Sequence, residues 1–215
     1  MVEKETDIDV DLIIKNAQRL NNDAKCLKKN ASFASAYALA VLALEELGKA
    51  FLKRYCHEQE LSSLRKKYSY HRIKQCIVPS IYMAGASKEA MTTYLRERGY
   101  EIKHRDEISE WQAKNEVSFW EFDDGLRESM ANSVLGSDNP RFLNHSKIGA
   151  LDKAKQSALY IDKEFIDIGL TPFDFTEEHA EDVISRFDGA LDKIEDHMIA
   201  HMTLAIFKSA LRDDP

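Results

Sequence analysis

Cysteine, proline and glycine are scarce in this chain of 215 residues, which has three Cys, four Pro and eight Gly. Few Gly and Pro favour long helices over a protein of strands and turns, because these two residues are the strongest helix breakers. Cys26, Cys56 and Cys76 are widely separated and form no CxxC pair. This spacing argues against a disulfide framework and against a structural zinc site, so we expect reduced thiols.

Long hydrophobic runs are also missing. The longest strongly apolar stretch, Phe33 to Leu44, is shorter than the about 20 residues that a bilayer requires. The first residues, MVEKETDIDVD, are acidic and contain no apolar signal region. We therefore expect a cytoplasmic protein that does not associate with a membrane.

An excess of positive charge is absent as well. The net charge of −7 argues against a dominant electrostatic grip on nucleic acid. One basic stretch stands out, RKKYSYHRIK from Arg65 to Lys74, with five Lys or Arg and one His. The chain contains no P-loop, GxGxxG turn, nucleophile-elbow Ser or catalytic-Cys motif.

Helical periodicity is what the sequence does have, with no strong strand or hairpin signal. It predicts an all-α, single-domain helical bundle of five to seven helices that spans residues 1–215. The third periodic segment contains Pro79, which we expect to interrupt or kink it. The last is expected to run unbroken from Thr176 to Leu211. The periodic segments cover residues 10–29, 32–58, 61–98, 106–135, 147–168 and 176–211.

The segment Ala36–Lys49, AYALAVLALEELGK, is the most informative one. Nine uncharged residues precede Glu45, Glu46 and Lys49 in a helix that must be central and buried. Charges in such a helix have to be paired or hydrogen-bonded. The alternative is a surface ion pair, since both spacings to Lys49 place opposite charges side by side. Gly48 is expected to allow a close helix crossing.

The second candidate constellation is YHRIK, in which His71 and Lys74 share one helix face and Gln75 flanks them. Histidine titrates near neutral pH and serves as a general acid or base, while Lys can stabilise a phosphate or a developing negative charge. The alternative reading is a solvated basic face.

Two weaker candidates lie elsewhere. His197 and His201 are four residues apart and could bind one metal, although half-buried polar neighbours are the simpler interpretation. The aromatic residues between 111 and 122 indicate a core more than a stacking platform for bases. They are Trp111, Phe119, Trp120 and Phe122.

Three elements in order resemble the AbiV family of abortive-infection proteins. They are AYALAVLALEELGKA at Ala36–Ala50, YHRIK at Tyr70–Lys74, and KQSALYID at Lys155–Asp162 with Pro172 beyond it. The resemblance covers most of the chain and is weakest over residues 98–153. AbiV proteins are in turn similar to the HEPN superfamily of small helical bundles, which implies an HEPN-like fold and a role in phage defence.

The HEPN resemblance also implies an activity. Many members are metal-independent ribonucleases that act as dimers, with an Arg and a His a few residues apart at the dimer cleft. Arg65 and His71, with five residues between them, match that spacing, but Lys66 stands where a small polar residue is usual. Six positions on one helix would place the two side chains roughly 120° apart, so they converge only if Arg65 lies in the preceding turn.

These observations lead to one expected site and three functional hypotheses. The first hypothesis is a metal-free ribonuclease; the second is a non-catalytic module that arrests the infected cell through a phage protein or a translation-related protein. The third is a metalloenzyme built on His197 and His201. The ribonuclease and the non-catalytic module need no cofactor, and the partner of the ribonuclease is RNA. We also expect a homodimer, because of the superfamily resemblance and the long apolar stripe of the terminal segment. We expect Glu45 or Glu46, Lys49, His71 and Lys74 to form one polar cluster between the second and third periodic segments, and the alternative is a structural network that fixes their packing. The residues expected to act in catalysis are His71, Lys74, Glu46, Lys49, Glu45 and Arg65.

Overall fold

The computed structural model describes residues 9–97 and 124–212. These residues form ten α-helices and one 3-10 helix, with no strand among them. The all-α prediction is confirmed, and the ten helices exceed the expected five to seven because several periodic segments are divided by turns. The helices are α1 (Val10–Lys29), α2 (Phe33–Tyr55), α3 (Glu58–Arg65), α4 (Tyr70–Glu97), α6 (Asp124–Leu135), α7 (Asn139–Lys147), α8 (Ala150–Leu159), α9 (Lys163–Asp167), η1 (Pro172–Asp174), α10 (Glu177–Leu191) and α11 (His197–Arg212).

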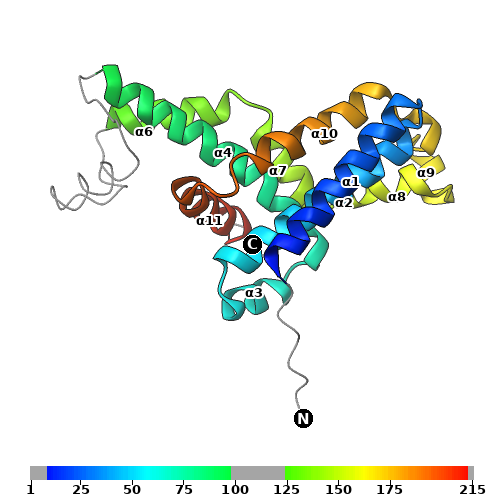
Figure 1. Cartoon of the computed structure of the whole chain (residues 1–215), viewed down its shortest axis with the longest axis horizontal. Coiled ribbons are helices and arrows are strands. Elements are labelled where there is room, and N and C mark those ends of the chain that lie inside the picture. Colours follow the sequence, from blue (N-terminus) through cyan, green and yellow to red (C-terminus); the bar gives the residue numbers. More distant parts are fainter. Residues whose placement is uncertain (1–8, 98–123, 213–215) are drawn as a thin grey trace, which may run out of the picture.

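Helix α2 is the centre of the molecule. It packs against α1, α4, α8 and α10, and α1 runs alongside it in Figure 1. Thirteen of its 23 residues are buried, so it is covered on nearly all sides, as its long uncharged run predicts. Leu44, Leu47 and Phe51 are fully buried there and join one hydrophobic core that extends through α4, α10 and α11.

Helix α4 continues through Pro79, so the proline does not interrupt it, one of the two expected effects. Proline removes only one backbone donor, and packing on both sides of it keeps the helix together. Ile73, Ile77 and Ile81 are fully buried on the side of α4 that joins the main core. Tertiary contacts therefore outweigh the local preference of one residue.

The last periodic segment is broken, which corrects the expectation of one helix from Thr176 to Leu211. Helix α10 ends at Leu191 and α11 begins at His197. The carboxylate of Asp196 accepts hydrogen bonds from the backbone N–H groups of Met198 and Ile199 at 3.0 and 3.1 Å, so it caps the new helix. This break lets α11 turn back and pack along α4.

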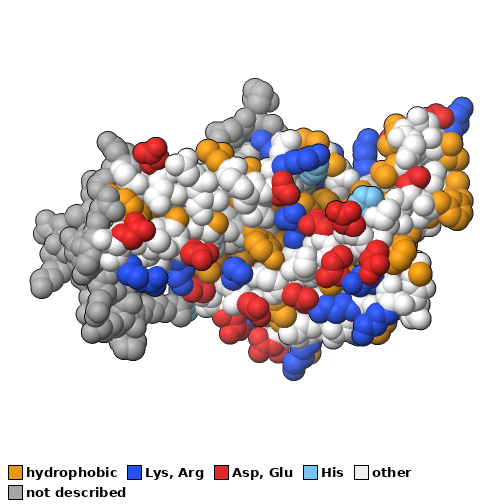
Figure 2. All heavy atoms as spheres, turned by 90° about the horizontal axis from the view of Figure 1, so that it is seen from above, with side chains coloured by type: hydrophobic (Ala, Val, Ile, Leu, Met, Phe, Trp, Pro, Cys, Tyr) orange, Lys and Arg blue, Asp and Glu red, His pale blue; other side chains and the backbone are white. Residues whose placement is uncertain are grey.

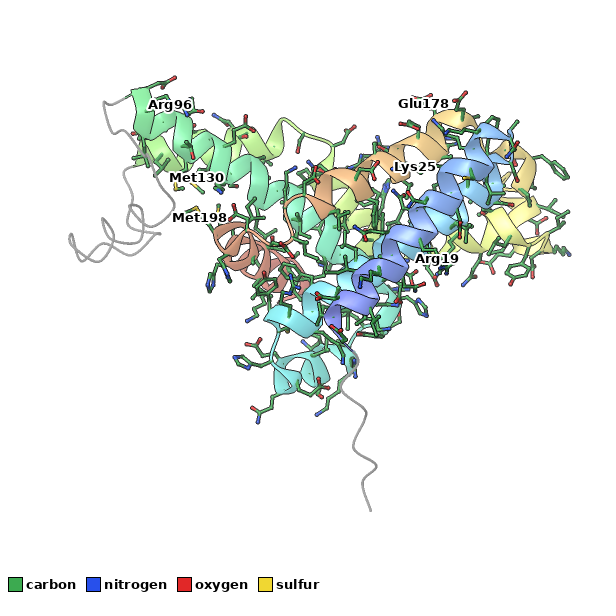
Figure 3. All side chains as sticks on the ribbon, in the orientation of Figure 1. Arg19, Lys25, Arg96, Met130, Glu178 and Met198 are labelled. Atoms are coloured by element: carbon green, nitrogen blue, oxygen red, sulfur yellow. The ribbon has the colours of Figure 1, made fainter. Side chains whose placement is uncertain are left out.

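A second, smaller core lies at the far end of α4. It contains Met91, Tyr94 and Leu126, with Met130 of α6 and Met198 of α11 packed against it. Figure 3 shows these two methionines facing each other between their helices. The four aromatic residues expected to be core, Trp111, Phe119, Trp120 and Phe122, lie outside the described residues.

The turn between α7 and α8 brings the later part of the chain back to α2. Gly149 precedes α8 with φ of +81°, a left-handed conformation that favours glycine. A Cβ there would also lie 2.6 Å from Nε of Arg72, so the side chain of Arg72 from α4 lies against this turn. Within the described ranges, no helix has the length and apolar character needed to cross a membrane.

Candidate functional site around Glu45

The carboxylate of Glu45 is the centre of a buried polar cluster. Glu45 is only 2% exposed and comes from α2, while its partners come from α4 and α8. Nδ1 of His71 lies 2.7 Å from it, Nε2 of Gln75 2.8 Å, Nζ of Lys74 3.3 Å and Nζ of Lys155 2.7 Å. We call these five residues, together with Asp152, the Glu45 cluster.

The cluster forms because α2 and α4 approach each other closely one turn beyond Glu45. At Gly48 an added Cβ would lie 2.2 Å from the carbonyl oxygen of Lys74, well inside van der Waals contact. Only glycine permits this approach, so the predicted close crossing at Gly48 is confirmed. The crossing places the first turns of α4 directly against the carboxylate of Glu45.

Helical spacing then aligns the donors of α4. His71, Lys74 and Gln75 occupy positions i, i+3 and i+4, which share one helix face. All three donate to the same carboxylate. A single helix turn therefore supplies three of the four hydrogen bonds to Glu45.

Lys155 supplies the fourth hydrogen bond and extends the cluster to Asp152. Its ammonium lies 2.7 Å from Glu45 and 2.9 Å from the carboxylate of Asp152, one turn earlier on α8. Two carboxylates thus face the two ammonium groups of Lys74 and Lys155. The buried charges are balanced, as their low exposure to solvent requires.

These contacts change the acidity of two groups. Burial alone would raise the pKa of Glu45, but hydrogen bonds from Lys155 and His71 and the charges of the two lysines lower it below its usual 4.5. Burial alone would lower the pKa of Lys155, but the hydrogen bonds to Glu45 and Asp152 raise it above 10.5. Glu45 is therefore ionised and Lys155 protonated at neutral pH.

His71 is the member of the cluster that reaches solvent, with 54% of its side chain exposed. An ionised carboxylate only accepts hydrogen bonds, so the Nδ1 atom facing Glu45 carries the proton. Nε2 is then the free ring nitrogen and can accept a proton. Carboxylate and imidazole together form an oriented acid–base pair at the protein surface.

The two lysines have a different role because both are buried. Lys74 is 7% and Lys155 8% exposed, and the ammonium of Lys74 also lies 5.1 Å from the centre of the Tyr70 ring. Their hydrogen-bonding groups are directed at Glu45. They hold the carboxylate that orients His71, and they are poorly placed to bind a phosphate themselves.

Arg65 lies outside α4 as the last residue of α3, so Arg65 and His71 are not on one continuous helix. Its side chain is 42% exposed, and one guanidinium nitrogen is 3.8 Å from the carboxylate of Glu58. The guanidinium carbon lies 4.2 Å from the centre of the Tyr70 ring. Tyr70, the residue before His71, thus connects Arg65 to the edge of the Glu45 cluster.

Glu46 and Lys49 are placed elsewhere, on the side of α2 that faces α1. They pair with each other at 3.5 Å, and Nδ2 of Asn16 in α1 donates to Glu46 at 3.4 Å. Adjacent residues on a helix point about 100° apart, so Glu45 and Glu46 meet different neighbours. The expected single cluster is in fact two groups, with Glu45 in one and Glu46 and Lys49 in the other.

Sequence reasoning gave no role to Lys155 or Asp152. Lys155 did belong to the KQSALYID element, but nothing local pairs it with a carboxylate 110 residues away. Gln75 was noted only as a neighbour of His71 and Lys74. A signal did exist, because the two Glu residues of α2 required buried donors and Lys155 precedes an apolar run.

Glu45, His71 and Asp152 also have the atoms to bind a metal ion, with one ligand atom from each lying within 4.8 Å of the others. The ammonium of Lys155 already bridges the two carboxylates, in the position a cation would take between them. Among the described residues this is the one such group, so the expected alternative of a His197–His201 site has no third ligand there. His197 instead packs edge-on against Tyr55, with ring centres 6.3 Å apart.

A protein-family model described as AbiV, of HEPN type, matches residues 10–187. The chain belongs to the AbiV family. The match contains all of the Glu45 cluster as well as Arg65, and family membership associates the protein with abortive infection, a form of phage defence. Comparisons with curated proteins and with solved structures found no match.

Proposed function

We propose that this AbiV-family protein is a phage-defence effector that cleaves RNA without a metal, with His71 as the general acid and base. One observation carries the proposal: the imidazole is half exposed while its Nδ1 atom lies 2.7 Å from a buried carboxylate. An oriented imidazole with a free Nε2 atom is what proton transfer requires.

The chemistry follows from the substrate's own nucleophile. Nε2 of His71 takes the proton of a ribose 2′-hydroxyl, whose oxygen attacks the adjacent phosphorus. The bond from phosphorus to the 5′-oxygen breaks, and that oxygen is protonated by the imidazolium. The products are a 2′,3′-cyclic phosphate and a 5′-hydroxyl, and no metal is needed because the nucleophile is internal.

The other residues of the site stabilise the charges that are present or that form during the reaction. Glu45 orients the imidazole through Nδ1 and stabilises the imidazolium that forms during the reaction. Arg65 is exposed and lies 4.2 Å from the centre of the Tyr70 ring, next to His71 in the chain, and it would stabilise negative charge on the phosphorane. Lys74 and Lys155 hold Glu45 and have no contact with RNA in this mechanism.

The test is cleavage of total cellular RNA by the purified protein in EDTA. Wild type should cut and leave cyclic phosphate ends, whereas His71→Ala should lose at least about 100-fold in rate, the usual contribution of a general acid or base. His201→Ala is the matched control, because His201 is also an exposed histidine in a helix. Cleavage that persists in His71→Ala would remove His71 from the mechanism.

The same variants should be compared in phage-infected cells, where any activating phage component is present. We expect His71→Ala to lose protection and His201→Ala to keep it, with RNA breakdown following protection in each strain. Full protection by His71→Ala without RNA breakdown would contradict the ribonuclease.

That second result would support a non-catalytic module that acts through a protein partner. Two observations favour this alternative. The net charge of −7 weakens intrinsic affinity for RNA, and Lys74 and Lys155, the cations closest to His71 in the cluster, are buried. Capture of a stoichiometric phage or translation protein by both wild type and His71→Ala would establish it.

A further inference from the structure

Tyr70 contacts cations from both parts of the candidate site. It is the first residue of α4 and comes directly before His71. The guanidinium carbon of Arg65 lies 4.2 Å from the centre of its ring, and the ammonium nitrogen of Lys74 lies 5.1 Å from it. An aromatic ring attracts a cation that lies within about 6 Å of its centre. One ring therefore contacts an exposed cation of α3 and a buried cation of the Glu45 cluster.

The turn between α3 and α4 fixes the position of Tyr70. The hydroxyl of the buried Tyr68 donates to the carbonyl oxygen of Leu211 in α11 at 3.1 Å, which anchors the turn in the core. The hydroxyl of Ser69 accepts from the backbone N–H of Arg72 at 3.4 Å, in the manner of an N-cap. Tyr70 then begins α4 with its side chain partly buried. The ring is thus attached to a turn that is held on both sides.

Arg65 is held more weakly by its ion pair than by this ring. Its guanidinium lies 3.8 Å from the carboxylate of Glu58, and the two side chains are 42% and 77% exposed. An ion pair so open to solvent contributes little, whereas an Arg over a partly buried ring is attracted more strongly because water screens it less. Tyr70 therefore restricts the guanidinium, and Glu58 is a partner that a phosphate can displace.

The surface charge makes a cation of fixed position important. The net charge is −7, and Lys74 and Lys155 are buried against Glu45. On the face drawn in Figure 2, the Lys and Arg side chains of the described residues lie among Asp and Glu side chains and form no continuous basic surface. A phosphate at His71 would then be bound by individually placed donors more than by the overall field of the protein.

We infer that Tyr70 is a positioning residue of the site, whose ring holds the guanidinium of Arg65 at the start of α4 for contact with the phosphate next to the attacked 2′-hydroxyl. This role rests on the proposed function, because it acts through Arg65 on the same substrate. A planar guanidinium has five N–H donors, so contact with a ring leaves donors for the phosphate oxygens. The role requires the ring of Tyr70 and not its hydroxyl.

The test is a double-mutant cycle on kcat/KM for cleavage of an RNA oligonucleotide in EDTA. Tyr70→Leu should lower kcat/KM about 3–10-fold, as expected for loss of a cation–ring contact. In the Arg65→Ala background the same change should have little further effect, because the two residues act as one unit. Tyr70→Phe keeps the ring and should restore most of the rate. The pH dependence of the rate should keep its shape in Tyr70→Leu, since His71 and Glu45 are unchanged.

Tyr82→Leu is the matched control. Tyr82 also belongs to α4, and the ammonium of Lys193 lies 5.3 Å from the centre of its ring. Its hydroxyl donates to carbonyl oxygens of Ser185 and Arg186 in α10, so Tyr82→Leu should lower the thermal stability and leave cleavage by the folded protein unchanged. Circular dichroism checks that each variant is folded. Tyr70→Met replaces Tyr70→Leu if that variant is not, because Met adapts to irregular space.

Binding of the same oligonucleotide with 2′-fluoro groups, which has no nucleophile, separates this inference from the ribonuclease. If wild type binds it but does not cut RNA, coupled losses of affinity in Tyr70→Leu and Arg65→Ala would support the role of Tyr70 while the ribonuclease fails. If wild type cuts RNA, a Tyr70→Leu loss that persists in full without Arg65, or a Tyr70→Phe variant as slow as Tyr70→Leu, would overturn the role of Tyr70 and leave the ribonuclease intact. A wild type that neither binds nor cuts would overturn both.

Discussion

Glu45 shows how one residue can determine the arrangement of three helices. Its carboxylate accepts four hydrogen bonds from α4 and α8, and its charge is the main compensation for the buried ammonium groups of Lys74 and Lys155. Removing one partner of a buried ion pair is far more costly than the pair itself is stabilising, because the remaining charge stays desolvated. The neighbouring Glu46 is less buried, so the loss of its charge is the comparison for the loss of the Glu45 charge.

At this scale we predict that Glu45→Gln lowers the free energy of unfolding by about 3 kcal/mol or more, since Gln leaves the buried Lys74 without its countercharge and leaves Lys155 with Asp152 alone. Glu46→Gln should cost about 0–1 kcal/mol, as expected for a partly exposed pair. Urea unfolding of both variants at pH 7 measures the difference. Equal losses would mean that the Glu45 cluster contributes no more than a surface ion pair.

The pH dependence of the free energy of unfolding of the same two variants tests whether the charge of Glu45 causes this difference. The pKa of Glu45 in the folded protein lies below its usual 4.5, so its stabilising effect is present above pH 4.5 and is lost as the pH falls through the folded value. The difference in free energy of unfolding between the two variants should therefore be constant near neutral pH and become smaller in acid. A gap that widens in acid would show that the charge of Glu45 is not its source.

At the scale of the elements, the decisive contact is the crossing of α2 and α4. Gly48 lets the backbone of Lys74 approach α2 so closely that no other residue fits there. Glycine within a helix is unfavourable by about 1 kcal/mol relative to alanine. The protein keeps it because the close approach brings His71 and Gln75 to Glu45.

We predict that Gly48→Ala destabilises the protein by about 1–3 kcal/mol, the usual cost of forced overpacking, despite the better helix propensity of alanine. Gly85→Ala in α4 is the control. There an added Cβ meets only the flexible side chain of Lys193, at 3.2 Å, so its effect should stay within about 1 kcal/mol. Chemical denaturation measures both, and a stabilising Gly48→Ala would contradict the close crossing.

At the scale of the whole molecule, α2 is enclosed by helices from both halves of the described chain, and one continuous core joins them. Cys76 lies in that core with no exposure to solvent, and burial raises the pKa of its thiol to about 12. A reagent for thiolates can reach it only when the core opens.

Cys76 should therefore report global unfolding. With excess DTNB at pH 8, we expect the exposed Cys26 to react fast and Cys76 to react only at the rate of unfolding. Loss of the slow phase in Cys76→Ala confirms its assignment. A Cys76 that reacts as fast as Cys26 would show that the core opens locally around α4.

By itself, the sequence determined the all-α class, the central position of α2 and the presence of a compensated polar site next to Ala36–Leu44. These properties follow from local periodicity and from the cost of burying a charge, and both can be recognised within one segment of the sequence. It also placed His71 and Lys74 on one face, since both belong to the same helix turn.

Only the tertiary structure decided which carboxylate the site uses and which donors complete it. Neighbouring residues on a helix differ by about 100° in direction, so the choice between Glu45 and Glu46 depends on which helices pack on each side. Lys155 reaches Glu45 from 110 residues away through the docking of α8. The division at Asp196 likewise depends on contacts between distant segments, which no local pattern encodes.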